Sequence, residues 1–295
     1  TSDVTTVVER SGASVLAAEP ATRAAQPVAP EHPAPAPPTG LASPSSILIG
    51  SLAFGALFLF AWQFLPPALG VPSFIIPTVT DLVREFGRMV QRENLAVHIL
   101  STATIATIGF VIGSFLGAAM GYVLGMSVFI EKVLSPYILG LQIAPKVAFA
   151  PLFIMWLGYN AWPKLLVTIL VVFFPILVNV LQSMKTVDRD LINLARAYSM
   201  SRMQIFWKIE VPASMPALMA GLRIGATLAV IGVTVGELVG GNTGLGYLIT
   251  FGEGQANTAM VFNAIVLLTL IGILLYRAVA MIEARVLHYI PRAMR

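Results

Sequence analysis

The chain of 295 residues contains no cysteine, and charged residues make up only 11% of it. The absence of cysteine excludes disulfides, a thiolate nucleophile and any cysteine-ligated metal site. A soluble domain normally carries about 25% charged residues, so the shortage of charge argues against an ordinary soluble fold. Hydrophobic residues instead make up 57% of the sequence, and the mean hydropathy is +0.84. The composition therefore predicts an all-α polytopic membrane protein.

Residues that carry chemistry are equally scarce. The chain has three histidines and few carboxylates, and they form no recognisable catalytic or metal-binding pattern. The sequence GGNTGLG at residues 240–246 resembles a phosphate loop only superficially, because no Lys-Ser or Lys-Thr follows it. We therefore expect no enzyme, no metal and no cofactor in this chain. The net charge of +4 is interpreted as topology and contact with anionic lipid, and nucleic acid is not an expected partner.

The chain is divided by composition into a tail and an apolar remainder. Residues 1–45 are rich in alanine and proline and lack the apolar core of a secretory signal, so a disordered cytoplasmic tail is predicted. Residues 46–75 are expected to hold a first transmembrane helix, ended by Pro66 and Pro67, and a linker. The main domain follows at residues 76–290. About six segments are long and apolar enough to cross a bilayer: 47–65, 97–125, 133–156, 163–184, 215–239 and 258–281.

Basic residues indicate which side of the membrane each loop occupies. Six spans that begin inside the cell place Lys132, the basic stretch 185–208 and the arginine-rich C-terminus on the cytoplasmic side, where such loops are retained. The arginines of the C-terminus are Arg277, Arg285, Arg292 and Arg295. The exception is an interfacial amphipathic helix beginning near Thr80 or Asp81, in which acidic side chains balance the arginines. Both termini are therefore predicted to be cytoplasmic.

The second span carries a glycine at every fourth position. On a helix this spacing makes one smooth face that allows a neighbouring backbone to approach closely. The series is Gly109, Gly113, Gly117, Gly121 and Gly125. His98, at the start of the same span, is interpreted as a polar residue at the membrane interface rather than as a site.

Two ionisable residues within the spans are candidates for a translocation path. Lys146 lies in the third span, which Pro136, Pro145 and Pro151 interrupt, and such interruptions are tolerated where the backbone faces protein or water. A lysine that reaches the interface or bonds to freed carbonyls is an equally good interpretation. Glu237, near the outer end of the fifth span, can pair with a cation, line an outer gate or reach water. A Lys146–Glu237 pair remains a hypothesis, since the predicted spans place the two residues at different depths.

One long polar stretch, residues 193–216, interrupts the apolar segments. Its apolar residues recur at steps of three and four, which is typical of one face of a short helix lying at the membrane surface or docking another protein. The residues at these steps are Leu194, Ala197, Tyr198, Ser201, Ile205 and Ile209. Periodicity alone favours neither alternative.

The sequence LARAYSMSRMQIFWKIEVPASMPALMAGLRIG resembles the cytoplasmic EAA loop of type I ABC importer permeases. The segments APKVAFAPLFIMWLG at 144–158 and GELVGGNTGLGYLI at 236–249 extend the resemblance over about residues 75–290. It is greatest to permeases for nitrate, taurine, alkanesulfonates and vitamin precursors, and GELVG with GLGYLI favours a pyrimidine or riboflavin-type precursor. Two positions depart from the pattern: Asn193 replaces the usual glutamate and Ser199 the usual glycine.

The resemblance implies a type I ABC importer transmembrane domain at 76–290 in the bacterial inner membrane. It also implies a coupling loop at 186–214 with two short helices, at about residues 194–207, joined by a turn. A second permease copy, two ATPase subunits that bind ATP and Mg, and a periplasmic or lipid-anchored solute-binding protein are the implied partners. The residues expected to couple to the ATPase are Asn193, Leu194, Ala195, Arg196, Ala197, Ser199, Met200 and Arg202. Lys146, Glu237, Pro145 and Pro151 are expected to line the path.

Two other classes of protein remain open at this point. An autonomous ion-coupled secondary transporter would use Lys146 and Glu237 as a relay, but it leaves the polar stretch without a purpose. A membrane anchor without a transport path suits the glycine series and not the proline-broken third span. Neighbouring genes for an ATPase and a solute-binding protein would favour the importer.

Overall fold

The computed structural model describes residues 44–289. Of the predicted tail at 1–45, residues 1–43 lie outside the described residues, as do Arg292 and Arg295, whereas residues 44 and 45 already belong to the first helix. The described chain falls into two units, divided between Phe54 and Gly55 within the first helix. The described part of the shorter unit is exposed, apolar helix, and the larger unit contains the remainder of the first helix and every later helix.

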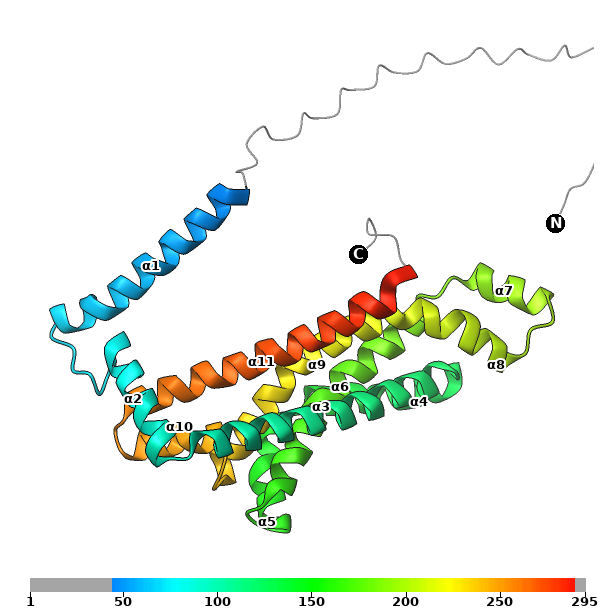
Figure 1. Ribbon diagram of the computed structural model, residues 1–295. Coiled ribbons are helices and arrows are strands. Elements are labelled where there is room, and N and C mark those ends of the chain that lie inside the picture. The colour runs from blue at the N-terminus through cyan, green and yellow to red at the C-terminus, as the bar shows by residue number, and fades with distance from the viewer. Residues whose placement is uncertain (1–43, 290–295) are drawn as a thin grey trace, which may run out of the picture. The chain divides into compact units, whose positions relative to one another are not determined.

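Every regular element in residues 44–289 is helical (Figure 1), which confirms the all-α prediction. The helices are α1 Pro44–Ala68, α2 Val79–Arg92, α3 Leu95–Gly125, α4 Val128–Ile143, α5 Ala150–Leu157, α6 Ala161–Lys185, α7 Arg189–Ala197, α8 Arg202–Ile205, α9 Val211–Gly240, α10 Leu245–Gly254 and α11 Thr258–Val286. Short irregular turns of helix are η1 Lys146–Phe149, η2 Phe206–Glu210 and η3 Leu287–Tyr289.

Within residues 44–289, five stretches of helix are long and apolar enough to span a membrane, and a bent pair, if it is one span, makes a sixth. The bent pair is the predicted third span. It is not one helix but α4 followed by η1 and α5, with a bend of 77° at the break. The bend falls at Ala144 and Pro145, where the backbone leaves the helical conformation. Pro136 lies inside α4 without ending it, and Pro151 sits in the first turn of α5, where no amide donor is required.

The first helix does not stop at Pro66 and Pro67 as predicted but continues to Ala68. The amides that follow the prolines still find carbonyls, since Leu69 N–H donates to Leu65 O and Val71 N–H to Pro66 O, at 3.0 and 2.9 Å. A proline in the last turn removes its own donor while leaving those bonds intact.

The centre of the bundle is α6, which packs between α3 and α9. The glycine series of α3 lies directly against the backbone of α6. A Cβ placed on Gly113, Gly117 or Gly121 would come within 2.9, 2.6 and 2.9 Å of carbonyl oxygens of α6. Because no real side chain tolerates such approaches, the prediction of close packing on this face is confirmed.

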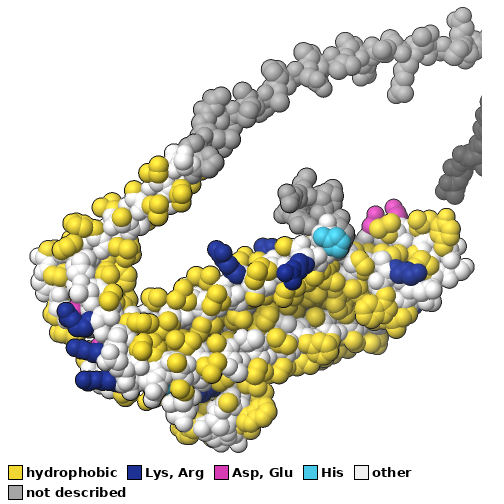
Figure 2. All heavy atoms as spheres, in the orientation of Figure 1, with side chains coloured by type: hydrophobic (Ala, Val, Ile, Leu, Met, Phe, Trp, Pro, Cys, Tyr) yellow, Lys and Arg dark blue, Asp and Glu magenta, His cyan; other side chains and the backbone are white. Residues whose placement is uncertain are grey.

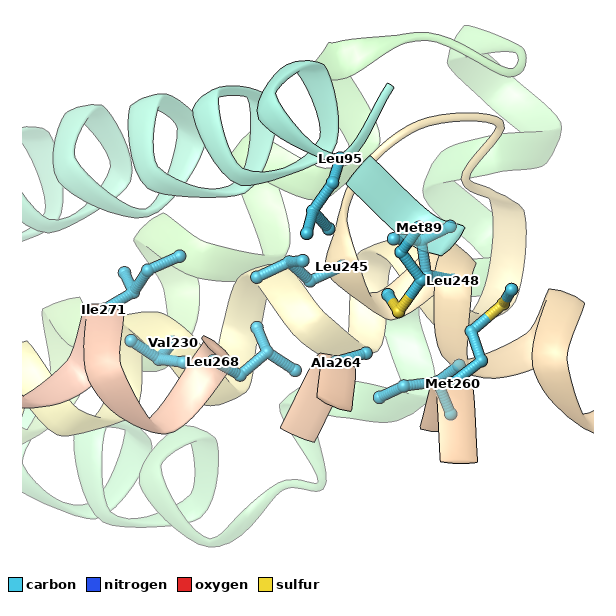
Figure 3. Close-up of a cluster of buried hydrophobic side chains, with 10 residues drawn as sticks. Met89, Leu95, Val230, Leu245, Leu248, Met260, Ala264, Leu268 and Ile271 are labelled. Atoms are coloured by element: carbon cyan, nitrogen blue, oxygen red, sulfur yellow. The ribbon is translucent and has the colours of Figure 1, made fainter. Parts of the chain in front are cut away.

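A second region of core joins α2, α3, α9, α10 and α11 (Figure 3). Thr78 caps α2 in a capping box with Asp81, which corrects the expectation of a cap at Thr80 or Asp81. The hydrogen bonds from Thr78 to the carboxylate lower the pKa of Asp81. Figure 2 shows lysine and arginine side chains gathered over α2, with hydrophobic side chains covering much of the bundle.

Candidate functional site

The polar stretch forms two short helices, as the resemblance to the EAA loop implied, and not the single helix that periodicity alone predicted. α7 ends at Ala197 and α8 begins at Arg202. Between them Ser199 adopts φ +57°, a left-handed conformation that ends a helix. The apolar stripe is therefore interrupted after Tyr198 and divided between the two helices.

The turn after α7 is a Schellman motif built without glycine. Ser199 N–H donates to Arg196 O at 2.9 Å, and Met200 N–H donates to Ala195 O at 3.0 Å. These two bonds define the motif, whose left-handed residue is usually glycine. The usual glycine of the EAA pattern thus falls at the position where the backbone requires positive φ, and Ser199 occupies it with some strain.

We therefore expect Ser199→Gly to stabilise the turn, by about 0.5–1 kcal/mol, because glycine adopts positive φ without a Cβ penalty. The measurement is the thermal unfolding midpoint of the purified chain in detergent. Ser201→Gly is the matched control: Ser201 caps α8 in a capping box with Gln204, so that loss of the cap is expected to lower the midpoint slightly. A lower midpoint for Ser199→Gly would contradict the assignment of strain.

Most of the predicted coupling residues are exposed, but not all. Ala195 is buried and Met200 is half-buried, whereas the other six are exposed. The exposed ones are Asn193, Leu194, Arg196, Ala197, Ser199 and Arg202. Large apolar side chains also lie open to solvent on the same loop, namely Leu194, Tyr198, Met203 and Trp207, each more than half exposed. Apolar exposure on this scale at a loop is typical of a docking surface.

The loop is held to the membrane helices at two places. Arg202 donates a hydrogen bond to the carbonyl of Met126, which follows α3. Tyr122 of α3 packs edge-on against Phe206, with ring centroids 5.6 Å apart. From Arg202 the helix continues through the π-helical turn η2 into α9, and the whole stretch from Arg202 to Gly240 is 39 residues long.

The predicted path residues around Lys146 lie at the bend of the broken span. The Lys146 ammonium donates to the carbonyls of Gln142 and Ala144, and lies 5.0 Å from the centre of the Phe174 ring. The structure thus favours the carbonyl-bonded interpretation of this lysine. Pro145 and Pro151 line a cavity of about 530 Å³ beside the bend.

Glu237 is completely buried, so the expectation that it can reach outer water is wrong. Its carboxylate accepts hydrogen bonds from the Thr102 hydroxyl at 2.9 and 3.0 Å and from Gly246 N–H at 2.8 Å. Thr102 in turn accepts from Leu245 N–H at 2.8 Å. The carboxylate and the hydroxyl together cap the N-terminus of α10, where backbone amides and the helix dipole favour negative charge.

The cation near Glu237 is Lys164 of α6, not Lys146. Lys164 is 3% exposed, and its ammonium donates to Thr243 O at 2.8 Å, one residue before Gly244, where an added Cβ would overlap the Glu237 carboxylate. His98, expected at the interface, is also buried and accepts a hydrogen bond at Nδ1 from Gly244 N–H at 3.0 Å. α3, α6 and α9 therefore meet the segment before α10 through one polar network.

The glycine-rich segment that resembles a phosphate loop surrounds this carboxylate instead. Gly244 has φ +114°, and a Cβ there would overlap the carboxylate of Glu237. A Cβ on Gly246 would lie 2.7 Å from the Glu237 Cβ. The glycines are thus spaced so that the backbone of this segment can approach the Glu237 side chain of the same chain closely.

Sequence reasoning identified Glu237 but missed Thr102 and Lys164. Thr102 occurs in an apolar run in which a threonine bonded to its own helix is common. Lys164 lies at the start of a span, where an interfacial lysine is the ordinary expectation. One pattern in the sequence could have indicated this pair. Lys164 and Glu237 have opposite charges, and both lie at the ends of predicted spans on the same side of the membrane.

The bundle of spans, the broken helix and the exposed helical pair define a helical membrane protein. Residues 94–288 match the family described as "Binding-protein-dependent transport system inner membrane component". The chain belongs to this family of ABC importer permeases and is a multi-pass protein of the inner membrane.

Several relatives and a solved structure agree with this assignment. The chain is 32% identical over 230 residues to the formylaminopyrimidine transport permease protein ThiX of Halalkalibacterium halodurans, covering 78% of this chain and 91% of that one. It is 34% identical over 227 residues to the riboflavin transport system permease protein RibX of Chloroflexus aurantiacus, covering 77% and 85%. A chain of the inward-facing MetNI methionine ABC transporter shares the fold, with TM-score 0.58 and 19% identity over 65% of this chain and 95% of that one.

Proposed function

We propose that this permease couples to an ATPase subunit through α7, the Ser199 turn and α8. The observation that carries the proposal is the exposure of Leu194, Tyr198, Met203 and Trp207 on two short helices that project at one end of the bundle (Figure 1). The coupling residues are Asn193, Leu194, Arg196, Ala197, Ser199 and Arg202 on the surface, with Ala195 and Met200 supporting the turn from beneath.

In this proposal the chain itself performs no catalysis. Each of two ATPase subunits binds ATP and Mg, and movement of the nucleotide-bound pair is transmitted through α8 into the spans. The inward-facing and outward-facing states make different contacts with the ATPase pair. This difference shifts the populations of the two states. A second copy of the permease completes the path, with Pro145, Lys146 and Pro151 at the bend beside it. Glu237, initially a path candidate, is assigned to the network that fixes α10.

The proposal also specifies the orientation of the chain in the membrane and the boundaries of its segments. Both termini are cytoplasmic, residues 46–75 form the first transmembrane helix and linker, and the transporter domain occupies 76–290. A periplasmic or lipid-anchored solute-binding protein delivers the solute on the side of α10. Membrane lipid surrounds the exposed apolar faces.

A heterocyclic vitamin precursor is the solute class that we propose. The names of two relatives, for formylaminopyrimidine and riboflavin transport, support it at 32% and 34% identity. A relative named for aliphatic sulfonates, from Bacillus subtilis, is 30% identical. The test is calorimetric titration of the co-purifying solute-binding protein with a formylaminopyrimidine, riboflavin and an alkanesulfonate; binding of the sulfonate alone would overturn the assignment.

The coupling proposal is tested by Ala197→Asp. Ala197 is exposed in the last turn of α7, and a carboxylate there places an unpaired charge in the proposed interface and opposes the helix dipole. We expect co-purification of the ATPase from the native host to fall about tenfold or more, together with solute-stimulated ATP hydrolysis in proteoliposomes.

The matched control is Ala161→Asp, an exposed alanine at the first position of α6, where a carboxylate suits the helix N-terminus. It is expected to retain the ATPase. Normal coupling in well-assembled Ala197→Asp would overturn the assignment of the loop. Solute flux by the purified chain alone, with no ATPase recovered, would instead favour a secondary transporter.

A further inference from the structure

Glu210 is a buried carboxylate that the proposed function does not use. It is 5% exposed, and its Oε2 atom has no hydrogen-bond partner among the described residues. It ends the π-helical turn η2, an irregularity of the kind that often occurs at functional sites. A buried, unpaired carboxylate oxygen is costly, so its retention calls for a partner that carries a cation or a donor.

The Glu210 side chain lines a cavity of about 760 Å³ with an unusual charge distribution. Five cationic side chains and two carboxylates line it. The cations are Lys132, Lys185, Arg189, Arg196 and Arg202, and the second carboxylate is Glu131. Lys185 is committed to Glu131 at 2.6 Å and Arg202 to the Met126 carbonyl. Within residues 44–289, Lys132, Arg189 and Arg196 have no such partner.

The cavity lies where the membrane spans end. Gly125 is the last residue of α3, Val128 the first of α4 and Lys185 the last of α6, and all three line it. Phospholipid phosphates lie at this level of a bilayer, and lysine and arginine side chains at span ends reach toward them. The position therefore suits a ligand that enters from the membrane interface.

The unpaired cations and the Glu210 carboxylate together determine which kind of ligand the cavity can bind. Unpaired cations attract a phosphate, and the Glu210 carboxylate requires a cation able to donate hydrogen bonds. A purely cationic partner would be repelled by Lys132, Arg189 and Arg196, while a purely anionic one would leave Glu210 unpaired. We propose that this cavity binds a phosphate joined to a primary ammonium, as in a phosphatidylethanolamine headgroup, with the ammonium on Glu210 and the phosphate on Lys132 and Arg189.

The experiment uses the full chain purified in detergent and titrated with short-chain phosphatidylethanolamine or phosphatidylglycerol, with bound lipid measured by native mass spectrometry. We expect saturable binding with a preference of about tenfold for phosphatidylethanolamine, since its ammonium adds a charge-assisted hydrogen bond. Glu210→Gln is expected to reduce the preference to about twofold or less. The variant should fold, because it removes an unpaired buried charge and keeps the shape of the side chain.

Two further variants separate the roles of the side chains. Glu253→Gln, at an exposed glutamate on α10, is the control and should leave the preference unchanged. Lys132→Gln should weaken binding of both lipids while leaving their ratio near that of the wild-type chain. Absence of saturable binding, or an unchanged preference in Glu210→Gln, would overturn the proposal.

Water-soluble phosphoethanolamine distinguishes the source of the ligand. If phosphoethanolamine binds weakly, the result supports a membrane lipid as the ligand. If it displaces the lipid at equal concentration, the result supports a soluble ligand with the same headgroup chemistry. Release of the ATPase by Glu210→Gln without any change in lipid binding would overturn the proposal and assign the cavity to a basic side chain of that subunit. The lipid measurement needs no ATPase, so it stands apart from failure of the coupling proposal.

Discussion

Replacing Gly117 by valine is expected to separate α3 from α6 and to prevent assembly of the bundle. A Cβ at this position would lie 2.6 Å from Phe173 O, 3.2 Å from Ile176 Cβ and 3.3 Å from Leu177 N. Two of these atoms belong to the backbone of a buried helix, so neither can rotate away. Overpacking of a core typically destabilises by 1–3 kcal/mol, and a rigid backbone contact places Gly117→Val at about 3 kcal/mol or more.

The measurement is the yield of monodisperse protein in detergent and its thermal unfolding midpoint. Gly140→Val is the matched control, because Gly140 lies on α4 where an added Cβ would have nothing within 4 Å. The control is expected to behave as the wild-type chain does apart from a small loss of flexibility. A Gly117→Val protein with an unchanged midpoint would show that the two helices do not pack on this face.

Replacing Glu237 by alanine is expected to release α10 from the rest of the bundle. The substitution leaves Gly246 N–H and the Thr102 hydroxyl without their acceptor, and leaves Lys164 buried without the nearby negative charge. Removing one partner of a buried charged network costs about 3–5 kcal/mol, much more than the loss of a surface carboxylate. Glu237→Gln keeps one acceptor oxygen and should have a smaller effect.

Hydrogen exchange of residues 241–257 measures this release directly, and the unfolding midpoint measures its effect on the whole chain. Glu253→Ala, at an exposed position on α10, is the control and is expected to change neither. A double-mutant cycle with Thr102→Val should give strong coupling, because the two side chains share hydrogen bonds. Independent, additive effects would contradict the network.

The sequence predicted the helical packing better than it predicted the breaks. Gly113, Gly117 and Gly121 recur at the helical period, so the face they form is local information. The position of the bend in the third span does not follow from such a local pattern. Pro136, Pro145 and Pro151 each interrupt the pattern, yet Pro145 alone marks the change of direction, since the others occupy positions that a helix accommodates.

In the functional sites, too, features set by neighbouring residues could be predicted, whereas contacts between residues far apart in the sequence could not. The resemblance located the coupling loop and its turn, but periodicity alone did not mark the end of α7, because Ser199 stands where glycine is usual and serine seldom adopts positive φ. Glu237 was noticed for its charge, whereas its donor Thr102 lies 135 residues away in the sequence. Hydrogen bonds across such separations leave no periodic pattern, so the partners required the fold.

The continuous helix from Arg202 to Gly240 has a mechanical consequence. At about 1.5 Å per residue its 39 residues extend roughly 58 Å, enough to join opposite surfaces of a bilayer within one element. The π-helical turn near its beginning is the place where such a rod can change its twist by one residue. Displacement of α8 would thus reach Glu237 along one continuous helix, as a rotation or a translation of that helix.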